Sequence, residues 1–161
     1  MKMMLRALLF LFFCETGAVN GQEKTAVFDR QSYYKAMEAD QLNLVNDQLT
    51  KLGSVSIPGK EAFEGALTMK KAGLSTNPDR KLSLFKSGHK KLEAAIQTDS
   101  SNVEFRFLRL MIQEHAPGFL HYKGALYTDS EYIRRSYKTL SPELQQAIVD
   151  YSKKSKILKL G

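Results

Sequence analysis

Apolar residues recur at steps of three and four positions along almost all of the chain after Gln22, which is the spacing of one buried face of an α-helix. No segment alternates apolar and polar residues for long, so the pattern argues against a β-sheet. The 161 residues are enough for one domain. The sequence therefore predicts an all-α fold with about seven helices in one compact domain.

Capping residues, glycines and prolines mark where these helices begin and end. The helices are expected at residues 30–37, 41–52, 60–72, 78–97, 103–114, 130–138 and 142–160. Their expected N-terminal caps are Asp29, Asp40, Asn77, Asp129 or Ser130, and Ser141. Residues 119–128 are expected to form an irregular connection, because Pro117 and Gly118 break the helical pattern before them.

Two of these helices have informative apolar faces. The helix over 103–114 is apolar on most sides, so we expect it to lie at the centre of the domain. The helix over 78–97 has an apolar stripe that we expect to face the core, formed by Leu82, Phe85, His89, Leu92 and Ile96. His89 on this stripe is predicted to be a packed, hydrogen-bonded core residue rather than a ligand.

The centre of the chain, residues 60–115, resembles a degenerate tetratricopeptide repeat, in which small residues let two paired helices approach and a large residue fills the groove between them. The matching residues are Ala66-x-x-Met69-x-x-x-Gly73, Gly88-x-x-x-Leu92-x-x-Ala95 and the turn Asp99-Ser-Ser-Asn102. The link between the helices is about ten residues longer than the 34-residue repeat allows, and Pro117 stands where a further helix would begin. The resemblance implies a helical hairpin that binds a partner.

A longer pattern resembles uncharacterised secreted all-helical proteins of the Bacteroidota type. It consists of Gly65-Ala-Leu-x-Met-Lys-Lys-Ala72, Lys90-Lys-Leu-x-x-Ala-Ile96, Phe105-Arg-Phe-Leu-Arg-Leu110 and Gln113-Glu-x-x-Pro-x-Phe-Leu120. This resemblance covers most of the chain after residue 21. It implies export and an all-helical fold, and it implies no activity and no site.

Residues 1–21 have the pattern of a secretory signal peptide. Lys2 and Arg6 give a positive start, the apolar run 5–14 follows, and Val19 and Gly21 are small residues placed for a cut before Gln22. The apolar run is too short to span a bilayer comfortably. We therefore expect an exported protein, periplasmic or secreted, whose mature part is a single α-helical domain over 22–161.

Cys14 is the single cysteine, and the expected cut removes it. One thiol can form neither an internal disulfide nor a cysteine-based zinc site. Lipidation of Cys14 would tether the chain as a lipoprotein, but that modification favours a small residue just before the cysteine, where Phe13 stands. The sequence thus favours ordinary export over anchoring at Cys14.

A polar stripe on the helix over 103–114 supplies the best binding candidates. Arg106, Arg109 and Gln113 lie at three- and four-residue spacing on an otherwise apolar helix. Guanidinium groups this close to a core need partners, either internal carboxylates such as Glu104 and Glu93 or an external anion. Internal pairing is the preferred interpretation. If these side chains instead face a cavity, they are the predicted binding residues.

His115, His121 and Tyr122 complete the candidate binding set. His115 and His121 are six residues apart across Pro117 and Gly118, and nothing in that spacing brings them together with Glu114, so no metal site is predicted. The sequence has no motif of a hydrolase and no glycine-rich phosphate loop. We therefore predict no catalytic residue, no cofactor and no enzyme.

The net charge of +7 falls to +6 when the expected leader is removed, so it belongs to the domain. Basic residues are spread over several helices, which argues against nucleic acid. The sequence favours an exported, non-catalytic protein interaction or scaffold module with an unidentified partner in the cell envelope. Two alternatives stay open: a small anionic-ligand binder or enzyme with a pocket around Arg106 and Arg109, and weak membrane contact through the basic C-terminal helix.

Overall fold

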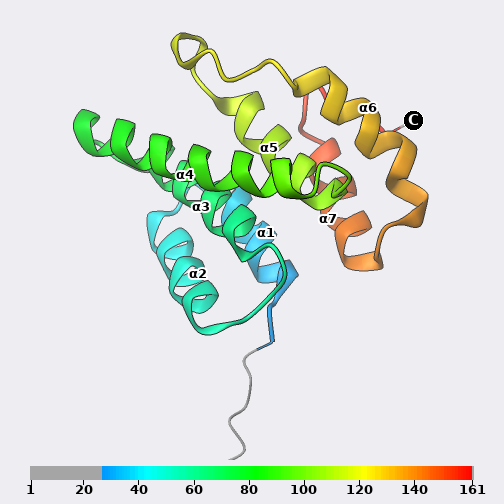
Figure 1. Ribbon diagram of the computed structural model, residues 1–161, viewed down its shortest axis with the longest axis horizontal. Helices are drawn as coiled ribbons and strands as arrows, with labels where there is room; N and C mark the ends of the chain where they lie inside the picture. Colours follow the sequence, from blue (N-terminus) through cyan, green and yellow to red (C-terminus); the bar gives the residue numbers. More distant parts are fainter. Residues whose placement is uncertain (1–26, 161) are drawn as a thin grey trace, which may run out of the picture.

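The computed structural model describes residues 27–160 and shows an all-α domain (Figure 1). Those residues form seven α-helices and two 3₁₀-helices, with no strand among them, which confirms the predicted fold class. The elements are α1 Arg30–Glu38, α2 Leu42–Ser54, α3 Lys60–Leu74, α4 Pro78–Thr98, α5 Val103–His115, η1 Gly118–Leu120, α6 Leu126–Ser136, η2 Tyr137–Thr139 and α7 Pro142–Ser152. The predicted leader and Cys14 lie outside the described residues.

Three predicted N-terminal caps are confirmed. The side chains of Asp29, Asn77 and Ser141 each accept a hydrogen bond from the backbone N–H three residues later. Such a bond satisfies one of the N–H groups that the first turn of a helix leaves without a partner. The starts of α1, α4 and α7 are therefore set by local sequence.

Two other cap predictions are wrong. Asp40 does not cap α2, whose N-cap is Gln41, and its carboxylate instead lies 2.9 Å from Lys70 Nζ on α3. Neither Asp129 nor Ser130 caps α6, because that helix begins at Leu126 and both residues are buried within it. In both cases a long-range contact determines the side chain's position.

The predicted end of the last helix is also wrong. α7 ends at Ser152, and residues 153–160 fold back against the domain with Leu158 fully buried. The Glu114 carboxylate holds this segment, accepting hydrogen bonds from Tyr151 Oη, Ser155 Oγ and the Lys156 backbone N–H at 2.9, 2.7 and 2.5 Å. Burial alone would raise the pKa of Glu114, but these hydrogen bonds outweigh it and lower the pKa.

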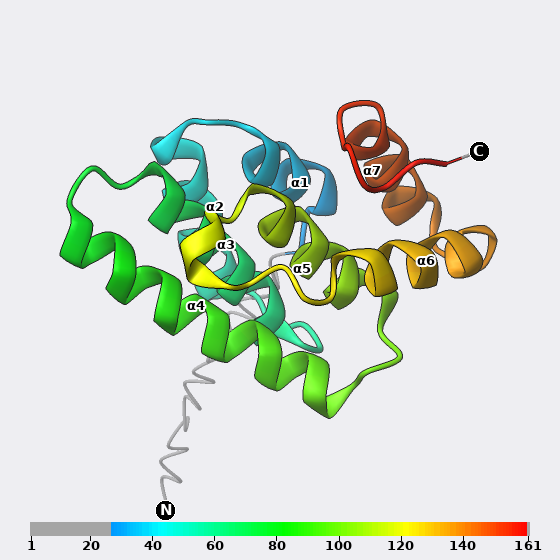
Figure 2. The same ribbon diagram turned by 90° about the horizontal axis from the view of Figure 1, so that it is seen from above.

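α5 lies in the middle of the molecule, between α1 and α4, as predicted (Figure 2). It contacts α3, α4 and α6. Seven of its side chains are buried: Phe105, Phe107, Leu108, Leu110, Met111, Ile112 and Gln113. A helix that is buried on most sides needs packing partners on those sides, and the neighbouring helices supply them.

α3 and α4 form a long antiparallel hairpin. The link between them is only residues 75–77, so the extra residues that separate it from a tetratricopeptide repeat lie within the helices. The two helices touch at Gly65 and Gly88: a methyl group added at Gly88 would lie 2.5 Å from the carbonyl oxygen of Gly65 and 2.9 Å from Met69 N. Glycine at both positions permits this close backbone approach.

Gly88→Ala should therefore destabilise the domain by about 2 kcal/mol, because the backbone atoms that the new methyl group meets cannot move aside as a side chain could. The matched control is Gly73→Ala in the last turn of α3, where an added methyl group meets nothing within 4 Å. That change should alter the free energy of unfolding by less than about 1 kcal/mol. Urea denaturation followed by circular dichroism measures both, and equal stability of the two variants would contradict the close crossing.

Candidate functional site

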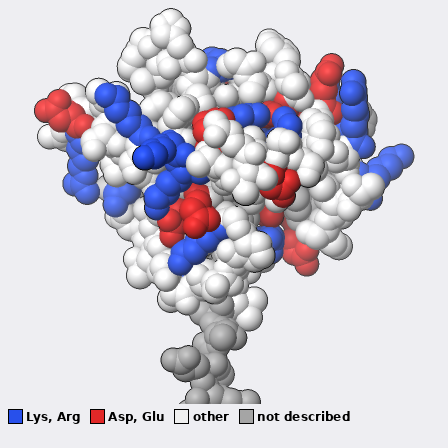
Figure 3. Space-filling view, in the orientation of Figure 1, with Lys and Arg blue, Asp and Glu red and all other residues white. Residues whose placement is uncertain are grey.

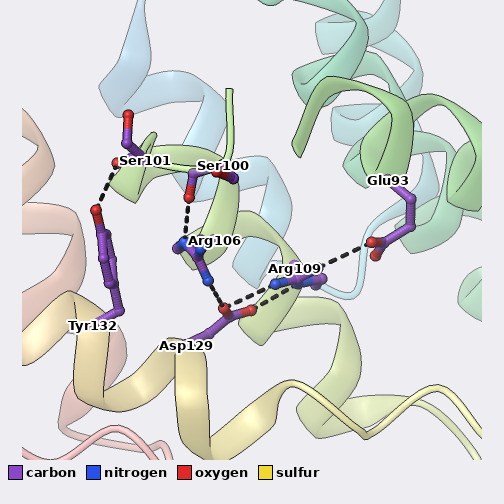
Figure 4. A network of polar contacts seen from close by, with 7 residues as sticks. All are labelled: Glu93, Ser100, Ser101, Arg106, Arg109, Asp129 and Tyr132. Carbon is purple, nitrogen blue, oxygen red and sulfur yellow. Dashed lines mark hydrogen bonds and ion pairs between the residues drawn. The ribbon is translucent and has the colours of Figure 1, made fainter. Parts of the chain in front are cut away.

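Arg106 and Arg109, two of the predicted binding residues, both contact Asp129 on α6 (Figure 4). Arg106 Nη1 lies 2.8 Å from Asp129 Oδ1, and Arg109 donates through Nε and Nη2 to both carboxylate oxygens at 2.7 and 2.9 Å. The Asp129 side chain is 0% exposed. A bidentate, buried ion pair is geometrically specific, and here it joins α5 to α6.

The same network reaches α4 and the connection before α6. Arg109 Nη1 lies 3.0 Å from Glu93 Oε2 on α4, and the Tyr122 hydroxyl donates to Glu93 Oε1 at 2.5 Å. The Arg106 guanidinium also lies over the ring of Tyr132, 4.4 Å from its centroid. The network therefore links three helices and one connecting segment.

The predicted internal pairing is right for Glu93 and wrong for Glu104. Glu104 accepts hydrogen bonds from Arg30 Nε at 2.9 Å and from the Tyr34 hydroxyl at 2.9 Å, on the opposite side of α5 from the network. Residues two apart on a helix do not face each other, so Glu104 could not reach Arg106.

Asp129, the carboxylate that Arg106 and Arg109 share, was not predicted from the sequence. A spacing signal could have revealed it, because Asp129 follows Leu126 by three positions and precedes Ile133 by four. All three residues are buried and share the inward face of α6. A carboxylate on an apolar helix face predicts a buried cation nearby.

The electrostatics of this network favour fixed charges rather than proton transfer. Burial alone would lower the pKa of Arg109, but the Asp129 and Glu93 carboxylates outweigh it and raise the pKa. Burial and the contact with Glu93 raise the pKa of Tyr122 far above its usual value. Arg109 therefore stays charged and Tyr122 stays a hydrogen-bond donor at every physiological pH.

The other predicted binding residues are not gathered here. Gln113 is 3% exposed, and its Oε1 has no hydrogen-bond partner in residues 27–160. His115 is exposed at the end of α5, with Nδ1 3.0 Å from the Met111 carbonyl oxygen. His121 is exposed and adopts a left-handed backbone conformation, with φ of 49°. Tyr122 is buried and packs edge-on against the half-buried His89.

The described residues contain no group of three or more His, Cys, Asp and Glu that could hold a metal ion. Over the same part of the chain, every helix is too short or too polar to cross a membrane. Figure 3 shows basic side chains spread over the width of one face, with acidic side chains among them. No single-sign patch covers that face.

A second candidate site is a groove of about 760 Å³ on the other side of α5. Its walls are contributed by the C-terminal parts of α1, α3 and α5, the N-terminal part of α4, η1, α7, and Lys154 after α7. Its apolar lining includes Met37, Met69, Leu74, Leu82, Phe85, Met111, Ile112, Ala116, Phe119 and Leu120. Its acidic and basic lining consists of Glu38, Asp40, Lys70, Lys81, His115 and Lys154. We refer to this cavity as the groove.

The groove exists because the core covers only the C-terminal part of the apolar stripe of α4. Leu92 and Ile96 are buried as predicted, whereas Leu82 is 45% exposed and Phe85 is half-buried, and both line the groove. Figure 1 shows the N-terminal end of α4 projecting past its neighbours. Across the groove, Phe119 in η1 is 75% exposed.

Of the six predicted binding residues, His115 lines the groove. Arg106 and Arg109 line neither the groove nor a smaller cavity that lies between α1 and α7. The predicted pocket around the two arginines is thus occupied by internal carboxylates.

Comparisons with protein-family models, with curated proteins and with solved structures found no match to this chain. The candidate site is therefore assigned from geometry and chemistry alone.

Asp129→Asn should destabilise the domain by about 3 kcal/mol, because it leaves two half-buried guanidinium groups without their shared carboxylate. The matched control is Glu131→Gln, which removes an exposed carboxylate from the same helix and one ion pair with Arg135. The control should cost less than about 0.5 kcal/mol. Chemical denaturation tests both, and an Asp129→Asn variant as stable as the control contradicts a structural role for the network.

Proposed function

We propose that this chain is an exported, non-catalytic helical protein that acts as a protein interaction or scaffold module in the cell envelope, with the groove as its docking site. The single observation that carries the proposal is the apolar groove flanked by the exposed side chains of Leu82 and Phe119. Contiguous exposed apolar surface is typical of interaction sites, since a soluble domain gains nothing by leaving it uncovered. The leader pattern and the resemblance to secreted helical proteins support export.

The lining of the groove suits a polypeptide ligand. Met37, Met69 and Met111 come from three different helices and form part of its wall. Methionine side chains are unbranched and polarizable, so they adapt to the shape of an incoming apolar side chain. Such surfaces bind amphipathic segments of partner proteins.

The two alternative functions have less support. Arg106 and Arg109 already hold Asp129 and Glu93, so an anionic ligand would have to displace buried carboxylates. For membrane contact, Lys153 and Lys154 in the C-terminal segment already pair with Asp150 and Glu38. Fewer basic groups are then available to face anionic lipids.

Site-specific photocrosslinking in living cells tests the proposal. A photoreactive amino acid replaces Leu82 in one variant. In the control it replaces Ser83, which is exposed on the same helix but does not line the groove. The chain recovered from the envelope should begin at Gln22, and the variant at 82 should form a discrete protein adduct that the variant at 83 lacks. Recovery of monomer alone from both variants would contradict the proposed function.

A further inference from the structure

We propose that the segment bound in the groove is an amphipathic helix of the partner protein, with acidic residues beside its apolar stripe. This inference rests on the proposed function and adds the chemistry of the partner. It follows from two observations: the shape of the uncovered face of α4, and the distribution of charge around the groove.

The uncovered face of α4 has the dimensions of a helix–helix contact. Pro78, Leu82 and Phe85 lie at three- and four-residue spacing, and all three line the groove. At 1.5 Å per residue they extend along about 11 Å of α4, or two turns. The walls are themselves mostly helices, so a further helix laid along α4 would continue the packing of the domain. Its apolar anchors would follow the same i, i+3, i+4, i+7 spacing.

Charges of both signs surround the groove at separate points. Lys70 pairs with Asp40 at 2.9 Å, and Lys154 pairs with Glu38 at 2.5 Å. The first pair joins α3 to the link between α1 and α2, and the second joins the segment after α7 to α1. A polypeptide carries polar groups along its whole length, so it can interact with charges at several points around the groove. A single acyl chain has only one charged end.

The charge left over on the α4 side is positive. Lys81 lines the groove and forms no ion pair within residues 27–160, whereas the other two lysines of the lining, Lys70 and Lys154, are both paired. A helix lying along this part of α4 therefore meets an unneutralised cation. Glutamate or aspartate beside its apolar stripe is the complement, and lysine or arginine at the same places would be repelled.

Two synthetic peptides of about 16 residues test the proposal, long enough to form a helix when bound. Both carry leucine and phenylalanine at i, i+3, i+4 and i+7, and their flanking positions are all glutamate in one peptide and all lysine in the other. With the full chain, we expect the glutamate peptide to bind about fivefold more tightly or better, measured by calorimetry.

Three variants locate the binding. Lys81→Glu should reverse the preference between the peptides, and Leu82→Glu should abolish binding of both. Ser83→Glu adds the same charge at an exposed position of α4 that does not line the groove, so it should change neither result. Because Leu82 and Ser83 are exposed, all of these variants are expected to fold, and their circular dichroism spectra check this.

The outcomes separate this inference from the proposed function. Equal binding of the two peptides, or binding that Leu82→Glu leaves intact, overturns the inference. So does binding of laurate in the groove by a chain that binds neither peptide, which would indicate a lipid ligand. If a protein adduct still forms at position 82 in these cases, the proposed function stands and the partner has a different chemistry. If no adduct forms, the proposed function is wrong together with the inference that rests on it.

Discussion

The close contact of Gly65 with Gly88 fixes how α4 lies on α3, and most of the structure follows from that placement. With no side chain at either position, the carbonyl oxygen of one helix approaches the backbone of the other directly. The contact sets the direction in which the apolar stripe of α4 faces. Its C-terminal half, with Leu92 and Ile96, enters the core, and its N-terminal half, with Leu82, faces the groove.

The buried ion pairs hold the opposite wall in position. Asp129, held by Arg106 and Arg109, fixes α6 against α5, while Tyr122 and Glu93 tie the preceding connection to α4. That connection follows directly from η1, which carries Phe119 at the groove. Arg106, Arg109 and Tyr122, which the sequence suggested as ligand contacts, thus act as structural supports, and the groove lies on the other side of α5.

Features that depend on residues close together in the sequence were predicted correctly, whereas several features that depend on distant residues were not. The all-α class and the caps Asp29, Asn77 and Ser141 depend on residues a few positions apart, and they were predicted correctly. Asp40 and Asp129 were assigned as caps by the same rule, but each is positioned by a partner far away in sequence, Lys70 for one and Arg109 for the other. The groove could not be predicted, because its walls come from six elements and its existence depends on which part of an apolar stripe stays uncovered.

If the proposed function is right, a protein covers the groove in the cell envelope. Covalent footprinting of the chain in intact cells and after purification tests it most directly, with Tyr127, 73% exposed and away from the groove, as the internal reference. Labelling of Leu82 and Phe119 is expected to be lower in cells than in the purified protein, while labelling of Tyr127 should be the same. Equal labelling of Leu82 and Phe119 in both states would contradict it.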